Sequence, residues 1–466
     1  MGEDRPVQGT ERPRQGVDDR DSQVAHEQWR TVRRFLNSHR HRLTRLAGEL
    51  YPPSARVAGT PLLAPPGWIP DRAVPLAEVE VGWTTDVAPG EVNGTEPETA
   101  ALRASPPPTV TRTPTPPQTG EPEQQGQSFA TYAHALTALD PPRLLENRTT
   151  YRLVGLEPPA GGSPLRLMFA PGSYFDVINI CEAAAHELAG AVLARVTDVG
   201  SAPPPGEMSG EMSGEMSGGS RPVLPPVSWP ELPWRQLIGD PFDGGRRPLL
   251  PAISTLVLRR DPTSGQASFP LHWRDPAKVA SGGGLYQVMP VGMFQPSADA
   301  AWNEANDLDL WRATVRELSE ELLGTDESYG TDTAPLDYDS WPLYRALAQA
   351  RTAGQLRVFW LGTGVDPLTL VVDMLQAAVF DADVFDTLFA NLVTTNTEGH
   401  VIGTRSDGSG AVTGIPFTAE TVERYAGTET GTETGTEPMQ PAGAALLRLA
   451  WRHRDVLLNP VAGFKR

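Results

Sequence analysis

Residues 316–324 read RELSEELLG, and this run predicts an α-helix with a charged face. Side chains three and four residues apart share one face of a helix, so Glu317, Glu320 and Glu321 are expected to lie together. Leu318 and Leu322 point to the opposite side and anchor the helix in a core. Like charges so close repel each other, and a divalent cation among them relieves that repulsion. Carboxylate oxygens suit Mg²⁺ or Mn²⁺.

The segments around this helix predict strands and further helices, which favours an α/β fold with a mixed sheet sandwiched between helices. A hairpin is expected from 253–259 and 267–273, with a third apolar run at 285–294. The helix itself is expected over 309–323. Further strands are expected at 356–361 and 368–372, and further helices at 380–392 and 442–457.

The charged run resembles the Nudix box, Gly-x5-Glu-x7-Arg-Glu-U-x-Glu-Glu-x-Gly-U, in which U is an aliphatic residue. The match covers Arg316, Glu317, Leu318, Glu320 and Glu321. The order of hairpin, strand, loop and helix is also the order that the Nudix fold uses. The chain is similar, too, to large actinobacterial proteins that carry a Nudix-like domain, some of which are regarded as transcription regulators.

The resemblance implies a Mg²⁺-dependent hydrolase that acts on a nucleoside diphosphate linked to another group. Glu317, Glu320 and Glu321 would then be the catalytic and metal-binding carboxylates. Arg316 would steady the loop and helix through a charge-assisted contact. Four basic residues on or after the hairpin are candidates to meet the phosphate oxygens of a nucleotide-type ligand, and they are Arg259, Arg260, Arg274 and Lys278.

The chain departs from the box pattern around this helix. Trp302 stands where the box has its first glycine, and Gly292 could serve only if the loop after it is expanded. The final glycine comes one residue late, at Gly324. Leu308 holds the position of the upstream glutamate. The general base is not identified by the sequence, and the acidic residues near that position are Glu304, Asp307 and Asp309.

Shifts in composition predict six segments. We expect a disordered tail at 1–25, a basic helix and small segment at 26–84, and a proline-rich linker at 85–127. A strand–strand–helix extension at 128–199 is expected to pack on the core. A loop with three Gly-Glu-Met-Ser units fills 200–226, and the Nudix-like domain fills 227–466. A second repeat at 427–437 marks another surface loop.

The basic helix leaves a second function open. Between Gln28 and Gly48 the chain has six arginines and no acidic residue. Docking of this helix on the acidic body of its own chain is the favoured interpretation, and contact of residues 28–50 with a protein partner or DNA is the alternative. The chain could therefore be a catalytically weak ligand sensor or transcription regulator. A third possibility is an interaction scaffold whose glutamates are incidental.

Composition excludes several classes of protein. The net charge of −18 argues against a general nucleic-acid binder, and the single cysteine, Cys181, excludes an internal disulfide framework. The N-terminus lacks the apolar region of a signal peptide. The most apolar stretch, 365–392, is interrupted by aspartates, so a membrane span is not expected there. We therefore expect a cytoplasmic location.

Three further features are interpreted as structural. Cys181 is expected to be a buried, inert thiol, and His186 a core or capping histidine. The aspartates at 373, 381, 383 and 386 could form an acidic rim. Their irregular spacing instead favours solvated loop and helix-cap carboxylates.

Overall fold

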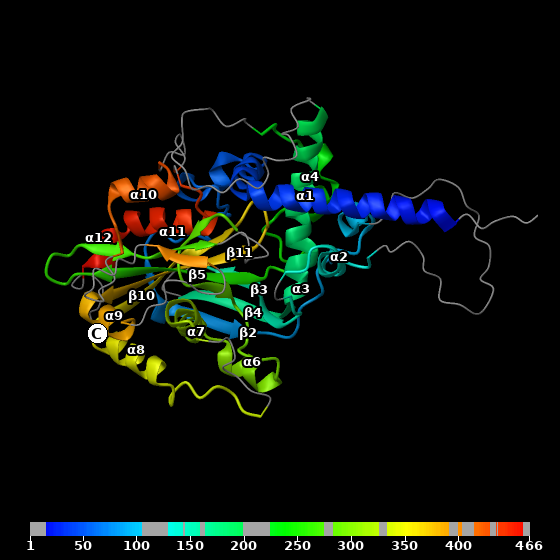
Figure 1. Ribbon diagram of the computed structural model, residues 1–466. Coiled ribbons are helices and arrows are strands. Elements are labelled where there is room, and N and C mark those ends of the chain that lie inside the picture. The colour runs from blue at the N-terminus through cyan, green and yellow to red at the C-terminus, as the bar shows by residue number, and fades with distance from the viewer. Residues whose placement is uncertain are drawn as a thin grey trace, which may run out of the picture.

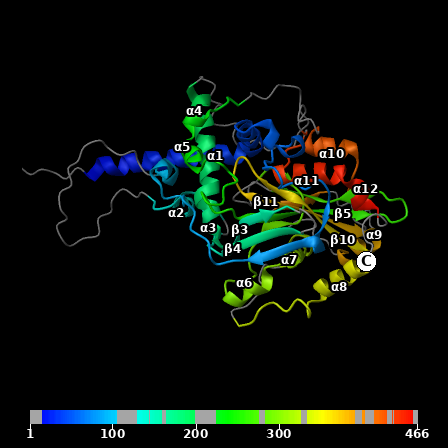
Figure 2. The same cartoon turned by 180° about the vertical axis from the view of Figure 1, so that it is seen from behind.

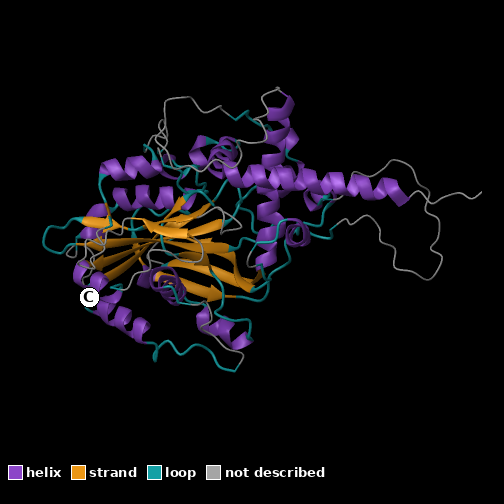
Figure 3. Ribbon diagram, in the orientation of Figure 1, coloured by secondary structure: helices purple, strands orange, loops and turns teal. Residues whose placement is uncertain are grey.

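The computed structural model describes residues 15–104, 129–142, 145–158, 164–198, 224–274, 283–325, 333–390, 399–402, 414–428, 435 and 437–459, with backbone alone at 15–20 and 399–400. The molecule is a mixed α/β protein whose strands lie at its centre, with helices on either side (Figure 3). Lys278, most of the Gly-Glu-Met-Ser loop and most of the second repeat lie outside the described residues.

Counted over the described residues, the central sheet has seven strands. Their order is β1 (Val74–Pro75), β10 (Leu356–Val365), β11 (Val372–Asp381), β5 (Pro251–Arg260), β6 (Ala267–Phe269) and β13 (Ile415–Pro416), and β9 (Val291–Met293) also pairs with β5. Strands β5 and β11 are parallel, and the other pairs are antiparallel. The sheet is therefore mixed, as the sequence predicted.

Helices cover both faces of this sheet. On one face, here called the α7 face, Ile253 and Val257 of β5 pack in one core cluster with residues of α7 (Leu310–Leu323) and α8 (Pro342–Thr352). On the other, the α11 face, Leu256 and Leu258 pack with residues of α10 (Ala419–Ala426) and α11 (Pro441–Arg452). The alternation follows from the pleat of the strand, which sends successive side chains to opposite faces.

Two smaller sheets flank the central one. Strand β4 (Leu165–Ser173) lies between β2 (Val79–Trp83) and β3 (Thr149–Glu157), and β7 (Leu271–Arg274) lies between β12 (Gly399–Ile402) and β8 (Tyr286–Gln287). The strands predicted at 151–156 and 165–169 are thus confirmed. The predicted hairpin is confirmed for β5 and β6, although its last residues, β7, belong to a different sheet.

Strand β11 was missed by the sequence analysis, which placed a strand at 368–372 and a helix from 380. The structure has one continuous strand, Val372–Asp381, followed by the short helix α9 (Ala382–Leu388). Nearly every residue of β11 is buried, because both faces of the sheet are covered. Such a strand shows no alternation of apolar and polar residues, so its pattern does not separate it from a buried helix.

The N-terminal part of the chain is folded over more of its length than predicted. Helix α1 spans Gln15–Glu49, so it overlaps the tail predicted at 1–25, of which residues 1–14 lie outside the described part. It extends away from the body on one side and crosses α4 (Ala183–Asp198) on the other (Figures 1 and 2). The segment after it supplies β1 at the edge of the central sheet and β2 in a flanking sheet.

The linker predicted at 85–127 also needs correction. Residues 85–104 are packed, with Val92, Thr99 and Leu102 buried and short 3₁₀ turns at Pro97–Thr99 and Ala101–Arg103. Only a few apolar side chains are needed to hold such a segment against a larger body, and their spacing follows no helix or strand period. The proline-rich remainder, 105–127, lies outside the described residues.

The remaining helices are short apart from the run after β4. They are α2 (Tyr132–Leu139), α3 (Tyr174–Asp176), α5 (Pro233–Ile238), α6 (Ala301–Asp307) and α12 (Arg454–Leu458). A π-helical segment, Val177–Glu182, joins α3 to α4, which confirms the helix predicted from Tyr174. Within the described residues, Tyr174–Thr197 is the one helical run long and apolar enough to cross a membrane, and 72% of its apolar window is buried inside the fold. Core helices of folded domains show the same combination.

Candidate functional site

Helix α7 begins and ends at residues suited to those positions. Asp309 is the N-cap, and its side chain accepts a hydrogen bond of 2.8 Å from the backbone N–H of Arg312. Gly324 follows the last turn with a φ of 68°, a left-handed conformation that glycine adopts without strain. Gly324, which comes one residue later than the final glycine of the box pattern, therefore ends helix α7 one residue later than that pattern implies.

The apolar side of α7 anchors it as predicted. Val315, Leu318 and Leu322 are completely buried and belong to the core cluster of the α7 face. The helix is thus fixed in rotation, and its carboxylates take up defined positions relative to the sheet.

Two of the three glutamates lie against β9. The backbone N–H of Val291 donates a 2.8 Å hydrogen bond to Oε1 of Glu321, which is 7% exposed. Glu317 is half-buried and sits so close to Gly292 that a Cβ added at Gly292 would overlap its carboxylate. Glu320 is half-buried as well, and all three carboxylates have further interactions in the fold.

Arg316 makes the charge-assisted contact that the sequence predicted. Its Nη1 forms an ion pair with Oδ2 of Asp307 at 3.2 Å, and its Nη2 donates to the carbonyl of Gln295 at 2.6 Å. Asp307 is completely buried and also accepts a hydrogen bond of 2.8 Å from the hydroxyl of Tyr338. This network ties α7 to the loop before it.

Two of the three acidic candidates for a general base are occupied by contacts within the fold. Asp307 is committed to Arg316, and Asp309 caps the helix. Glu304 lies on α6, where burial raises its pKa above the ordinary value, and its carbonyl accepts a hydrogen bond from Tyr151. The carboxylates of Asp307 and Asp309 therefore have structural roles.

Two of the basic candidates, Arg259 and Arg274, have partners within the fold. Arg259 binds Asp386 of α9 through two hydrogen bonds of 2.7 and 2.6 Å. Ile253 of β5 is the register partner of Gly292, and Arg259 lies six residues further along β5. At the rise of a β-strand, the Cα atoms of Ile253 and Arg259 are therefore about 20 Å apart. Arg274 donates to the side chain of Gln287 at 3.1 Å. Arg259 therefore has a carboxylate partner away from β9, and its contact with phosphate stays a prediction.

The aspartates of β11 and α9 do not form a rim. Asp381 pairs with Arg260 at 2.9 Å, and Asp386 pairs with Arg259. Asp373 is buried rather than solvated, accepts a hydrogen bond from Ser254, and has its pKa raised to about 7 because burial disfavours its charged form. Asp381 and Asp386 are thus paired with arginines of β5.

A divalent cation would have a limited set of ligands on α7. Within the described residues, no three His, Cys, Asp or Glu side chains form a group that could hold a metal ion. Mg²⁺, however, keeps several waters and commonly binds one or two carboxylates together with the phosphates of its substrate. Glu317 and Glu321 lie one helical turn apart against neighbouring residues of β9, and this pair fits that smaller set of ligands.

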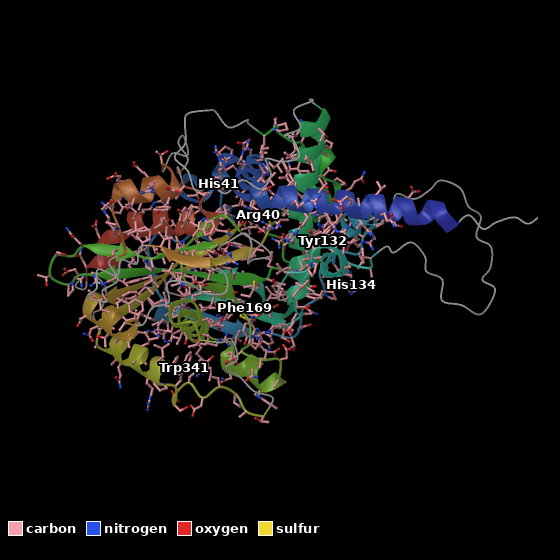
Figure 4. The ribbon with its side chains drawn as sticks, viewed as in Figure 1. Arg40, His41, Tyr132, His134, Phe169 and Trp341 are labelled. Atoms are coloured by element: carbon pink, nitrogen blue, oxygen red, sulfur yellow. The ribbon has the colours of Figure 1, made fainter. Side chains whose placement is uncertain are left out.

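The basic face of α1 is used within the chain. Arg33 and Arg40 are buried and both contact the carboxylate of Glu182, in the π-helical segment (Arg40 is labelled in Figure 4). Burial by itself raises the pKa of Glu182, but the two guanidinium groups outweigh that effect and lower it to about 2. These contacts agree with docking of α1 on its own chain. Sequence reasoning missed Glu182, which lies in a run that otherwise reads as an apolar helix.

The two residues interpreted as structural are buried. His186 lies 3.1 Å from the hydroxyl of Tyr132, and burial lowers its pKa to about 3. Cys181 is buried, which raises the pKa of its thiol to about 11 and keeps it protonated at neutral pH.

A cavity of about 30 Å³ lies on the side of the molecule away from α7. Its lining includes His41 and Arg45 of α1 and Tyr425 of α10, and His41 is labelled in Figure 4. This volume holds about one water molecule, so the cavity is too small for a nucleotide. No family model matches the chain, and no curated protein matches it.

Proposed function

We propose that this chain is a Mg²⁺-dependent, Nudix-type hydrolase that acts on a nucleoside diphosphate linked to another group. Its Nudix-like domain would be 227–466, with α7 as the helix of the box. The observation that carries the proposal is the carboxylate pair of Glu317 and Glu321. Both lie against β9 on a helix whose rotation is fixed by its buried leucines and by Arg316.

Glu317 and Glu321, with Glu320 beside them, would hold the cation. A bound Mg²⁺ supplies positive charge that offsets the charge on a diphosphate, and it lowers the pKa of a bound water. The protein's own part is to keep the carboxylates in place. Val291 holds one oxygen of Glu321, and Gly292 leaves room for the carboxylate of Glu317 directly above the strand.

A second candidate is a catalytically weak ligand sensor or transcription regulator built on the same site. One observation favours it, because Asp307 and Asp309, two candidates for a general base, are committed to structural contacts. Such a protein would bind a nucleotide-type ligand at the α7 carboxylates without turning it over. A protein partner or DNA would then contact residues of α1 other than Arg33 and Arg40, which bind Glu182.

The test uses the purified full-length chain with dinucleotides and nucleoside diphosphate sugars in the presence of Mg²⁺. Chromatography detects the phosphate-bearing products. Glu317→Gln should lower the rate at least about 100-fold, because even residues that only support a metal ligand contribute about 10- to 100-fold. Glu420→Gln and Glu423→Gln, on the exposed face of α10, are matched controls that should leave the rate unchanged.

The outcomes separate the candidates. Turnover that Glu317→Gln abolishes and the α10 controls retain supports the hydrolase. Thermal stabilisation by a nucleotide without turnover supports the sensor, since a ligand that prefers the native state raises its stability. Turnover that persists in Glu317→Gln would remove both proposals from this site.

A further inference from the structure

Two arginines and one aspartate lie together where β11 ends and α9 begins. Arg357 on β10 is 5% exposed and Arg260 on β5 is 7% exposed. Asp381 is the last residue of β11, between those two strands. None of these residues belongs to the α7 site.

The strand register places all three side chains on the α11 face of the sheet. Arg357 is the partner of Val379, and Val379 is the partner of Leu258. Both Val379 and Leu258 belong to the core cluster that packs against α11. Asp381 and Arg260 are partners two residues further along their strands, so they point to the same side. The α7 carboxylates lie on the other face.

The charges in this cluster do not balance. Nη1 of Arg260 pairs with Oδ1 of Asp381 at 2.9 Å, which matches one positive charge with one negative charge. Within the part of the chain that the structure describes, the buried Nε and Nη2 of Arg357 have no hydrogen-bond partner, and Nε of Arg260 has none either. One guanidinium charge thus remains without a counter-charge among the described residues. Burial and the neighbouring Arg260 both lower the pKa of Arg357, and the single carboxylate of Asp381, which raises it, does not reverse the shift.

Several other buried arginines of the fold have acceptors. Arg316 pairs with Asp307, and Arg33 pairs with Glu182. Arg235, which is 1% exposed, donates to the carbonyls of Pro367 and Leu368. Proteins rarely bury a charge without such partners, because the cost of removing it from water is high. Arg357 is therefore an exception that calls for a partner of its own.

We propose that Arg357 and Arg260 form a binding site for an oxyanion, the shared chemistry of a phosphate or a carboxylate group. A guanidinium presents a planar fork of N–H donors and no acceptor, which matches the oxygens of such an anion. One bound anion supplies the missing negative charge and accepts hydrogen bonds from Nε and Nη2 of Arg357. The side chain of Asp381 is 19% exposed, so the cluster lies near the surface at this end of the sheet.

The experiment measures binding of inorganic phosphate to the full-length chain. Thermal unfolding is followed as phosphate, sulfate or acetate is added at constant ionic strength, with chloride as the reference. Phosphorus NMR of the phosphate line gives a second readout. We expect phosphate to raise the midpoint of unfolding and to broaden its own line, because it binds the native state preferentially. A larger effect of acetate than of phosphate would identify a carboxylate as the ligand.

Variants assign the effect to these residues. Arg357→Met should remove both signals and, without added anion, should unfold at the same or a higher temperature, since it deletes a buried charge that has no partner. Arg357→Lys keeps the charge but loses the fork, so binding should weaken. Arg345→Met, at an exposed position of α8, is the matched control.

Three results would overturn the proposal. The first is the absence of any shift or line broadening with phosphate, sulfate and acetate. The second is a shift that Arg357→Met retains. The third is a crystal structure grown in phosphate in which Arg357 binds Asp381 or another carboxylate of the chain and no anion is present. Because none of these readouts involves hydrolysis, the result is independent of the function proposed for α7.

Discussion

Arg316 and Arg357 are equally buried, at 4% and 5% exposure, but they have different surroundings. Arg316 on α7 has Asp307 as its ion-pair partner and the carbonyl of Gln295 as an acceptor. Arg357, on the α11 face, has neither kind of partner among the described residues for two of its nitrogens. Burial alone therefore does not reveal what an arginine does. An arginine with its acceptors supplied by the chain holds the fold together, and one without them is a candidate to bind a ligand.

The same substitution at both positions gives the largest expected contrast. Arg316→Met leaves the buried carboxylate of Asp307 without its counter-charge, which should lower the free energy of unfolding by about 3–5 kcal/mol. Arg357→Met removes a charge that has no partner and should cost nothing. Denaturant unfolding of both variants measures the difference. Equal losses of stability in the two variants would contradict the proposed difference between Arg316 and Arg357.

The cluster of Glu182 extends the comparison to α1. Glu182→Gln removes the carboxylate that the buried Arg33 and Arg40 share, and Arg33 keeps only its second ion pair, with Asp140. We expect a loss of about 3 kcal/mol at pH 7, which corresponds to the lowering of the Glu182 pKa from 4.5 to about 2. A lowered pKa contributes stability that is complete above the unfolded value and is lost as the pH falls through the folded value.

The pH dependence of that difference is the check. The stability gap between wild type and Glu182→Gln should be constant above about pH 4.5 and should shrink as the pH falls toward about 2. Urea unfolding at several pH values measures it. A gap that does not change over this interval would show that the two arginines do not hold Glu182 in its charged form.

The smallest expected effect on stability belongs to Gly292→Ala. Its new Cβ would displace the carboxylate of Glu317, the far end of a flexible side chain, so stability should change by no more than about 1 kcal/mol. The Mg²⁺-dependent rate should nevertheless fall. Gly155→Ala is the matched control in β3, where a Cβ meets the side chain of Met168 at an ordinary 3.4 Å. An unchanged rate in Gly292→Ala would show that the position of Glu317 does not matter.

Sequence reasoning predicted the parts of this molecule that rest on local periodicity. The i, i+3 and i+4 spacing predicted α7 and its buried leucines, because both depend only on the helix itself. The contact of Arg316 with the loop before it was also expected. Its partner Asp307 was one of several acidic residues near the expected position, and the spacing alone did not single it out.

The features that the sequence did not reveal depend on contacts between distant segments. The contact of Gly292 with Glu317 forms only when β9 and α7 come together, 25 residues apart in the chain. Arg259 was predicted to meet phosphate because it is a basic residue on the expected hairpin, and its ion pair with the distant Asp386 was not foreseen. Likewise, only the assembled strands β5, β10 and β11 show that two nitrogens of Arg357 lack hydrogen-bond acceptors among the described residues.

The hydrolysis rate of Glu321→Gln tests the central claim most directly. Glutamine retains a carbonyl oxygen that can accept the hydrogen bond from Val291, so this variant removes the charge and leaves the packing in place. If the α7 carboxylates act on a diphosphate, the Mg²⁺-dependent rate falls at least about 100-fold while the midpoint of thermal unfolding stays the same. A variant that folds normally and cleaves its substrate at the wild-type rate would contradict the account.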